Sequence, residues 1–331
     1  MDAFLDSTLG ATPTSLNGRY GRYGRATWGT GIRRRLSVAI VNNMPDSALV
    51  ATERQFTRLV TEAAGDAVDI GLFHIPGLPR GEEAKQTLAM RYKPVTALFY
   101  MHVDAVIVTG NEPRAARIND EPYWDEITQL IDWVAASGSH SLWSCLAAHA
   151  AVLHLDGIER RRLPIKKSGV LASVVTLPGQ QLPDVLSVCH SRINGLDKGE
   201  LLGRGYDIIS EAAGEHVDMF TKRFGAPFLF LQGHPEYDPD SPMREYRRDV
   251  GRYLNGYRDI YPEMPENYFD SATVIRMENY RTIAERTRDI RLFENFPQTS
   301  LRASLEQRLA QSAAAVFANW VTQVAADQMA G

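Results

Sequence analysis

The sequence predicts an α/β protein in which a mostly parallel β-sheet is flanked by helices. Short apolar segments rich in β-branched residues, typical of buried parallel strands, alternate with helical segments along the first half of the chain. Alternation of this kind indicates a parallel sheet that helices cover on both faces. The 331 residues contain neither an internal repeat nor a long linker, which favours one large domain with a full core.

The first half of the chain supplies the predicted parallel strands. The segment 36–41 (LSVAIV) opens the ordered part, and the third strand ends in a glycine turn at Gly110. The fourth strand stops at Cys145, so the chain passes from a buried strand directly to a thiol. Predicted strands cover 36–41, 68–73, 105–110 and 141–144, and predicted helices cover 52–60 and 123–135.

The second half is predicted to hold shorter strands and a terminal helix. A Tyr- and Pro-containing stretch follows Asp259, and the last helix begins near Ser300. Predicted strands cover 169–176, 185–191, 206–210 and 227–232. The apolar residues of the last helix fall on one face, and they are Leu301, Leu305, Leu309, Val316, Trp320 and Val324. We therefore predict a catalytic α/β domain over 36–258 and a C-terminal helical extension over 259–331 that packs on it.

Residues 1–35 are predicted to form a flexible N-terminal arm. They are rich in Gly, Arg, Ser and Thr, with too few apolar side chains to offset the entropy lost on ordering. The repeated Gly-Arg-Tyr within 17–25 suggests contact with RNA as an alternative. A formal net charge of −4 argues against a nucleic-acid surface, so we predict no nucleic-acid partner.

Composition excludes several other classes of protein. Hydrophobic residues make up 44% and charged residues 23% of the chain, as in ordinary globular proteins. No apolar run approaches the ~20 residues of a membrane helix, and the N-terminus lacks a secretory signal. The two cysteines, Cys145 and Cys189, do not form a disulfide scaffold or, without clustered histidines, a zinc site. We predict a cytoplasmic protein with no metal and no membrane contact.

Cys145 is predicted to stand on a nucleophile elbow, a sharp turn between a strand and a helix. An apolar strand ends at Trp143-Ser-Cys145, and small residues with helical spacing follow up to Gly157. The free N–H groups at the start of that helix, including that of Leu146, favour a thiolate and can bind an oxyanion. The alternative is a buried core cysteine, the commonest role of a free thiol.

His234 and Glu236 favour the catalytic alternative. Both follow a buried strand in Gly233-His-Pro-Glu236, and functional residues gather at the carboxyl ends of strands in open parallel sheets. A catalytic cysteine needs a base to take its proton, and that base needs a third group to fix its tautomer. The sequence therefore predicts a triad of Cys145, His234 and Glu236.

These motifs resemble the class I glutamine amidotransferase-like enzymes, and within them the homoserine O-acyltransferases. The resemblance covers about Leu36 to Val324 and implies the flavodoxin-like α/β sheet of that superfamily. As an ordered set the matching blocks are specific. They are Asn42-Asn-Met-Pro45, Thr52-Glu-Arg-Gln-Phe56, Tyr123-Trp124, Lys166-Lys-Ser-Gly-Val170, His190-Ser-Arg192, Gly233-His-Pro-Glu-Tyr-Asp238, Glu245-Tyr-Arg-Arg-Asp249 and Phe317-Ala-Asn-Trp320.

The resemblance implies the reaction and the roles of further residues. Family members transfer succinyl or acetyl groups from coenzyme A to homoserine in methionine biosynthesis, by a ping-pong mechanism through the cysteine. No cofactor is then bound, acyl-CoA is a co-substrate, and the partners are small-molecule substrates and a second copy in a homodimer. Lys166, Ser191 and Arg248 correspond to residues that hold homoserine, and Arg or Lys suits its carboxylate.

Two departures from the family pattern bear on the donor side of the reaction. Asp46 and Ser47 stand where the family has lysines, one of which stabilises the oxyanion. Backbone N–H groups of Leu146 and near Gly110 and Asn111 are then expected to do more of that work, unless another cation replaces the lysine.

The second departure lies in the loop after the Thr109-Gly110 turn. Arg114 occupies the position with which the family selects the acyl group, so it is predicted to favour a donor that ends in a carboxylate. The alternatives are that Arg117 plays this part or that Arg114 is a solvent-facing loop residue.

The sequence also bears on His149, on Cys189 and on two alternative functions. His149, one turn after Cys145, is predicted to line the floor of the pocket. Cys189 precedes His190, but adjacent strand residues point to opposite faces, so no second catalytic pair is predicted. A glutamine-hydrolysing amidotransferase or amidase with the same triad is the alternative function. A binding protein with a lost active site is the third function, and Asp46 and Ser47 favour it.

Overall fold

The computed structural model describes residues 35–330, apart from residues 66, 213–215, 298 and 300–301. The arm predicted for residues 1–35 lies outside the described residues, except for Arg35 at its end. The described residues belong to a single compact unit, and it contains every residue of the predicted site.

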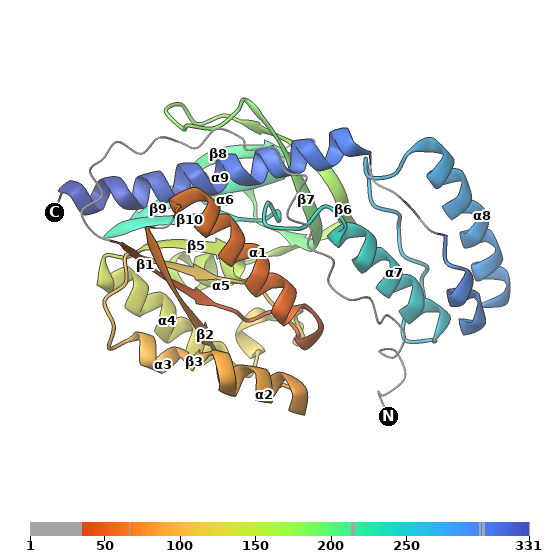
Figure 1. Ribbon diagram of the computed structural model, residues 1–331, viewed down its shortest axis with the longest axis horizontal. Coiled ribbons are helices and arrows are strands. Elements are labelled where there is room, and N and C mark those ends of the chain that lie inside the picture. The colour runs from red at the N-terminus through yellow and green to blue at the C-terminus, as the bar shows by residue number, and fades with distance from the viewer. Residues whose placement is uncertain (1–34, 66, 213–215, 298, 300–301, 331) are drawn as a thin grey trace. The chain divides into compact units, whose positions relative to one another are not determined.

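One ten-stranded sheet forms the centre of this unit (Figure 1). Its strands are β1 (Leu36–Val41), β2 (Val68–His74), β3 (Lys93–Pro94), β4 (Ala105–Val108), β5 (His140–Ser144), β6 (Arg161–Val175), β7 (Val185–Gly195), β8 (Asp207–Ala212), β9 (His216–Phe224) and β10 (Ala226–Leu231). Their spatial order is β3-β2-β1-β4-β5-β10-β9-β8-β6-β7. All pairs from β3 to β10 are parallel, whereas the pairs from β10 to β7 are antiparallel.

The α/β fold predicted from the alternating pattern is confirmed. The described helices are α1 (Asp46–Ala64), α2 (Glu82–Arg91), α3 (Val95–Leu98), α4 (Trp124–Ser137), α5 (Leu146–Asp156), α6 (Lys198–Gly203), α7 (Ser241–Leu254), α8 (Ser271–Thr287) and α9 (Ala303–Ala330), with 3₁₀ turns η1 (Ile118–Asp120) and η2 (Ile290–Asn295). Each predicted strand lies within or beside an observed strand, and β6 begins eight residues before the predicted 169.

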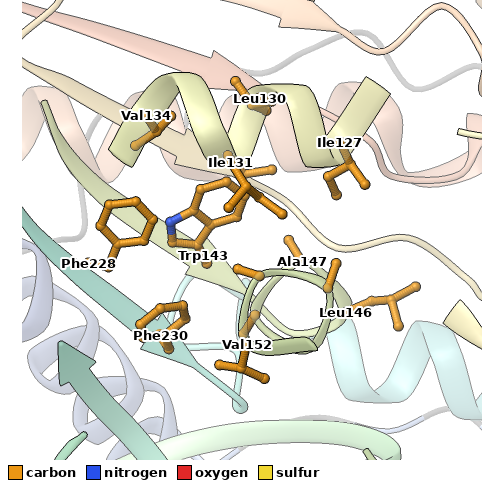
Figure 2. Close-up of a cluster of buried hydrophobic side chains, with 14 of the residues drawn as sticks. Ile127, Leu130, Ile131, Val134, Trp143, Leu146, Ala147, Val152, Phe228 and Phe230 are labelled. Atoms are coloured by element: carbon orange, nitrogen blue, oxygen red, sulfur yellow. The ribbon is translucent and has the colours of Figure 1, made fainter. Parts of the chain in front are cut away.

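A core of aliphatic and aromatic side chains joins one face of the sheet to α4 and α5. Trp143 of β5 stacks on Phe228 of β10, with ring centroids 5.7 Å apart. Figure 2 shows Ile127 and Ile131 of α4 meeting the helix that starts at Leu146. Since Trp143 and Leu146 flank the predicted nucleophile, this core fixes both sides of the turn that carries Cys145.

Helices α1 and α9 pack together on the other face. Phe56 of α1 and Phe317 of α9 meet edge to face at 5.9 Å, and both are fully buried. The N–H of Ser187 on β7 donates to Ser312 Oγ of α9 at 2.8 Å. In Figure 1 the long helix α9 runs beside α1, so the C-terminal part of the chain covers strands from both halves of the sheet.

Several elements of the second half were not predicted, among them one strand and one helix. Strand β9 lies between β8 and β10, and helix α8 lies in the stretch after Asp259 that was predicted only as rich in Tyr and Pro. Helix α8 joins α7 in a separate core that includes Tyr246, Tyr280 and Phe296. The apolar residues Ile275 and Ile283 of α8 are exposed, so the helix lacks a continuous apolar stripe that the sequence pattern could have revealed.

Candidate active site

Cys145 lies at a strained turn between β5 and α5. Its backbone has φ 52° and ψ −112°, in the left-handed half of conformational space that favours glycine. Such strain costs of order 1–3 kcal/mol and persists only where the surroundings enforce it. Here the Cys145 N–H donates to Leu231 O of β10 at 2.7 Å, and α5 begins at the next residue. The thiol therefore stands at the N-terminus of a helix, as the predicted elbow requires.

The loop after β4 crosses directly over this turn at Gly110. A Cβ atom at Gly110 would lie 3.0 Å from Leu146 N and 3.3 Å from Cys145 Cβ, so a side chain here would press on the backbone of the elbow. A small pocket beside the elbow brings together all three residues predicted to supply oxyanion-binding N–H groups. Its lining consists of Asn43, Thr109, Gly110, Asn111, Tyr123, Ile127, Leu146, Ala147 and Ala150.

His234 and Glu236 form a buried pair at the carboxyl end of β10. His234 Nδ1 lies 2.8 Å from Glu236 Oε1, and Ser144 Oγ donates to the same oxygen at 3.4 Å. The His234 ring also stacks on Tyr237, with centroids 4.3 Å apart, and the backbone N–H of His234 donates to Cys189 O at 2.7 Å. These contacts fix the orientation of the imidazole ring.

The electrostatics of His234 suit a partner of a thiolate. Burial by itself lowers its pKa, but the Glu236 carboxylate and the charge and hydrogen bond of Cys145 raise the pKa of His234 well above its ordinary value. The structure therefore brings the predicted triad together: the charge of Cys145 acts on His234, and His234 is hydrogen-bonded to Glu236. Such a site can form a covalent acyl intermediate.

Lys166 and Arg248 meet at a carboxylate that the sequence reasoning did not single out. Lys166 Nζ donates to Asp249 Oδ2 at 3.2 Å, and Arg248 Nε donates to Asp249 Oδ1 at 3.0 Å. Burial raises the pKa of Asp249, but Lys166 and Arg248 outweigh this and lower it. Asp249 directly follows Arg247 and Arg248 in a matching block. An acid next to two arginines was the only sign of this role in the sequence.

Three other residues of the site differ in their surroundings, two of them on β7 and one on α5. Ser191, predicted to hold the acceptor, is partly buried and lies opposite Ser168 of β6. Burial, with the charges of Glu236 and Glu245, raises the pKa of Cys189 far above that of a free thiol. Burial also lowers the pKa of His149 to about 4, and its Nε2 lies 3.2 Å from Gln232 Oε1. Both groups therefore stay neutral near pH 7.

The loop that carries Arg114 is held by its backbone. The N–H groups of Arg114 and Ala115 both donate to Glu121 Oε1, at 2.7 and 2.8 Å, and Glu121 is buried. The Arg114 side chain is exposed, and its charge acts on Tyr123 at the small pocket. Arg117 lies 4.0 Å from exposed Glu159.

Arg80 lies beside Asp46, one of the two positions where the family pattern has a lysine. Arg80 donates to Met44 O, and its Nη1 also contacts Asp46 Oδ1 at 3.1 Å. Its side chain is only 6% exposed. Asp46 further accepts from Gly81 N at 2.8 Å, so this acid is committed to the segment before α2.

Comparison with known proteins places the chain in a family. The family model described as homoserine O-succinyltransferase matches residues 29–330. The chain belongs to this homoserine O-succinyltransferase family. It is 43% identical to a homoserine O-succinyltransferase of Rhodopseudomonas palustris over 89% of this chain and 90% of that one. A homoserine O-succinyltransferase of Methylorubrum extorquens is 44% identical over 92% of each chain.

Solved structures show the same fold at low sequence identity. A glutamine amidotransferase from Thermotoga maritima aligns with a TM-score of 0.52 and 14% identity, over 88% of this chain and 99% of that one. A glutamine amido transferase from Methylobacillus flagellatus gives 0.52 and 12% over 88% and 95%. The class I glutamine amidotransferase-like fold is thereby confirmed.

Two kinds of feature are absent from the described residues. In that part of the chain, no helix combines the length and apolar character needed to cross a membrane. Across residues 35–330, gaps aside, no group of three or more His, Cys, Asp or Glu side chains has an arrangement that could hold a metal ion.

Proposed function

We propose that this chain transfers a succinyl group from succinyl-CoA to the hydroxyl of homoserine through an acyl-Cys145 intermediate. The observation that carries the proposal is the placement of Cys145 at a helix N-terminus, where its charge acts on His234, which is hydrogen-bonded to Glu236. Membership of the homoserine O-succinyltransferase family supports the substrates, because the similar proteins from Rhodopseudomonas palustris and Methylorubrum extorquens carry that name.

In the first half-reaction, the Cys145 sulfur attacks the thioester carbonyl carbon. The carbonyl oxygen becomes negatively charged in the tetrahedral intermediate, and the N–H of Leu146 and the backbone near Gly110 and Asn111 are proposed to bind it. The carbon–sulfur bond to CoA then breaks, and the CoA sulfur leaves with the proton of the His234 imidazolium. Cys145 is left as a thioester and His234 as a neutral base.

In the second half-reaction, the acceptor hydroxyl gives its proton to His234 as its oxygen attacks the acyl carbon. The bond to Cys145 breaks, which regenerates the thiolate–imidazolium pair and releases the ester. Glu236 keeps His234 in the tautomer that presents Nε2 to the reacting atoms, because it holds Nδ1 at 2.8 Å. Lys166, Ser191 and Arg248 are proposed to hold the amino acid, with the two cations at its carboxylate.

Arg114 is proposed to help select the succinyl donor. Its loop borders the small pocket beside Cys145 through Asn111 and Tyr123. A guanidinium there can pair with the distal carboxylate of a succinyl group, which an acetyl group lacks.

The test separates this function from its alternatives. Purified protein is incubated with succinyl-CoA, acetyl-CoA or glutamine, and free CoA and ammonia are measured in each sample, with and without homoserine. Release of CoA together with O-succinylhomoserine supports the proposal. Ammonia from glutamine instead points to an amidotransferase, and absence of both products points to a binding protein.

A further inference from the structure

Four cationic side chains converge on the buried carboxylate of Asp249, and we call this group the Asp249 cluster. Asp249 is 4% exposed. The distances to its carboxylate oxygens are 3.2 Å from Lys166 Nζ, 2.9 Å from Arg248 Nη2, 3.4 Å from Arg258 Nη1 and 3.8 Å from Arg252 Nη1. The buried acid therefore fixes the positions of side chains from β6, from α7 and from the segment after α7.

The cluster keeps positive charge after its acids are counted. Glu112 pairs with Arg252 at 3.0 Å, and Glu245, whose charge acts on Arg248, is hydrogen-bonded to Tyr237. Four cations thus face the carboxylates of Asp249, Glu112 and Glu245. The cations outnumber the carboxylates, so the cluster has a net positive charge that attracts an anionic ligand.

The outer parts of these arginines are open to solvent. Arg248 and Arg252 are each 40% exposed and Arg258 is 35% exposed. A guanidinium carries five N–H donors in a planar fork. Arg258 donates Nε to Ile260 O at 2.9 Å and Nη1 to Asp249, so its inner edge is fixed and its other N–H groups remain for a ligand.

Arg252 connects the acceptor side of the site with the donor side. It lies one helical turn beyond Arg248 on α7, and it pairs with Glu112, two residues after the Gly110 that crosses the elbow. Lys166 and Arg248 already have a ligand in the proposed function, the acceptor's carboxylate. Arg252 and Arg258 have none, although all four cations pair with the same buried acid.

We propose that Arg252 and Arg258 form a binding site for a phosphate group of the CoA donor, beside the buried Asp249 carboxylate with which both pair. The inference rests on the proposed function, because only an acyl-CoA brings phosphates to this site. Planar guanidinium groups match phosphate oxygens in geometry as well as in charge. The site gives CoA a contact remote from the thioester, which lowers KM without entering the chemical step.

The test compares succinyl-CoA with succinyl-N-acetylcysteamine, a thioester that has no phosphate. Arg252→Gln and Arg258→Gln are each expected to raise KM for succinyl-CoA by about ten-fold, the effect of losing one charged hydrogen bond. In both variants kcat/KM for the short thioester and KM for homoserine should match wild type. Added salt should raise KM for succinyl-CoA in wild type and do so less in the variants.

Two control variants separate phosphate binding from a structural role. Glu112→Gln breaks the pair with Arg252 but keeps the cation, so its KM for succinyl-CoA should stay the same or fall. Arg244→Gln removes an exposed cation of the same helix that pairs with Asp240 at 3.3 Å, outside the cluster, and should leave KM unchanged.

Direct binding gives a readout that does not depend on turnover. Calorimetric titration with desulfo-CoA should show weaker binding to Arg252→Gln and Arg258→Gln than to wild type. Unchanged binding and unchanged KM for succinyl-CoA, an equal loss with the short thioester, or a rise confined to homoserine KM each overturn the inference. A wild type that releases no CoA from either thioester contradicts the proposed function instead.

Discussion

The backbone holds Cys145, whereas side chains hold the cations around Asp249. Cys145 owes its place to a positive φ, to a bond with Leu231 O and to the close approach of Gly110. Arg248 is 40% exposed and is oriented by one neighbouring carboxylate. The position of the Cys145 sulfur is thus set by the backbone, whereas the cations are grouped around one buried carboxylate. Variants at the first region should stop chemistry, and variants at the second should weaken binding.

The largest effect is expected from removing the sulfur of the elbow. Cys145→Ala should abolish turnover, while Cys189→Ala should retain it, because Cys189 is buried and its raised pKa keeps the thiol protonated. After a short pulse of succinyl-CoA, mass spectrometry of wild type should find the acyl group on the peptide that contains Cys145. An acyl group on any other residue contradicts the mechanism.

The next effect separates the base from the residue that orients it. His234→Ala removes proton transfer and should lower kcat by about 10²–10⁴-fold, the range for general acid–base catalysis. Glu236→Ala should cost less, since the stacking contact with Tyr237 still holds the imidazole ring. Steady-state kinetics of both variants test this order. A harsher loss in Glu236→Ala than in His234→Ala reverses the assigned roles.

A smaller effect is expected on the side-chain-built half of the site. Arg248→Ala should raise KM for homoserine by about ten- to hundred-fold, because a charged hydrogen bond contributes about 1.5–3 kcal/mol. Formation of the acyl-enzyme should stay nearly intact, since the donor does not use this cation. Rapid-quench measurement of acyl-Cys145 checks the first half-reaction separately. Equal damage to both half-reactions removes Arg248 from the acceptor site.

The same contrast explains how much could be predicted from the sequence. The elbow is local: an apolar strand, Cys145 and a run of small residues are contiguous, and Gly233-His-Pro-Glu236 is equally compact. The Asp249 cluster brings together Lys166 and Arg258, which lie far apart in the sequence. No local sequence pattern predicts that these side chains meet. Helix α8 escaped prediction because its exposed Ile275 and Ile283 blur the apolar stripe. The predicted roles of Lys166, Ser191 and Arg248 stay predictions, as does the homodimer.

The smallest expected effect concerns Arg114, which combines a fixed backbone with an exposed side chain. Its backbone is fixed by two hydrogen bonds to buried Glu121, but its side chain is exposed, so water screens its charge. We expect Arg114→Gly and Arg114→Glu to lower the ratio of kcat/KM for succinyl-CoA to that for acetyl-CoA, Glu more than Gly because it repels the distal carboxylate. Arg117→Gly tests the alternative selector on the same loop and should leave the ratio unchanged. A ratio that moves by less than about threefold in both Arg114 variants, where a charged hydrogen bond predicts about tenfold, shows that Arg114 is not the selector.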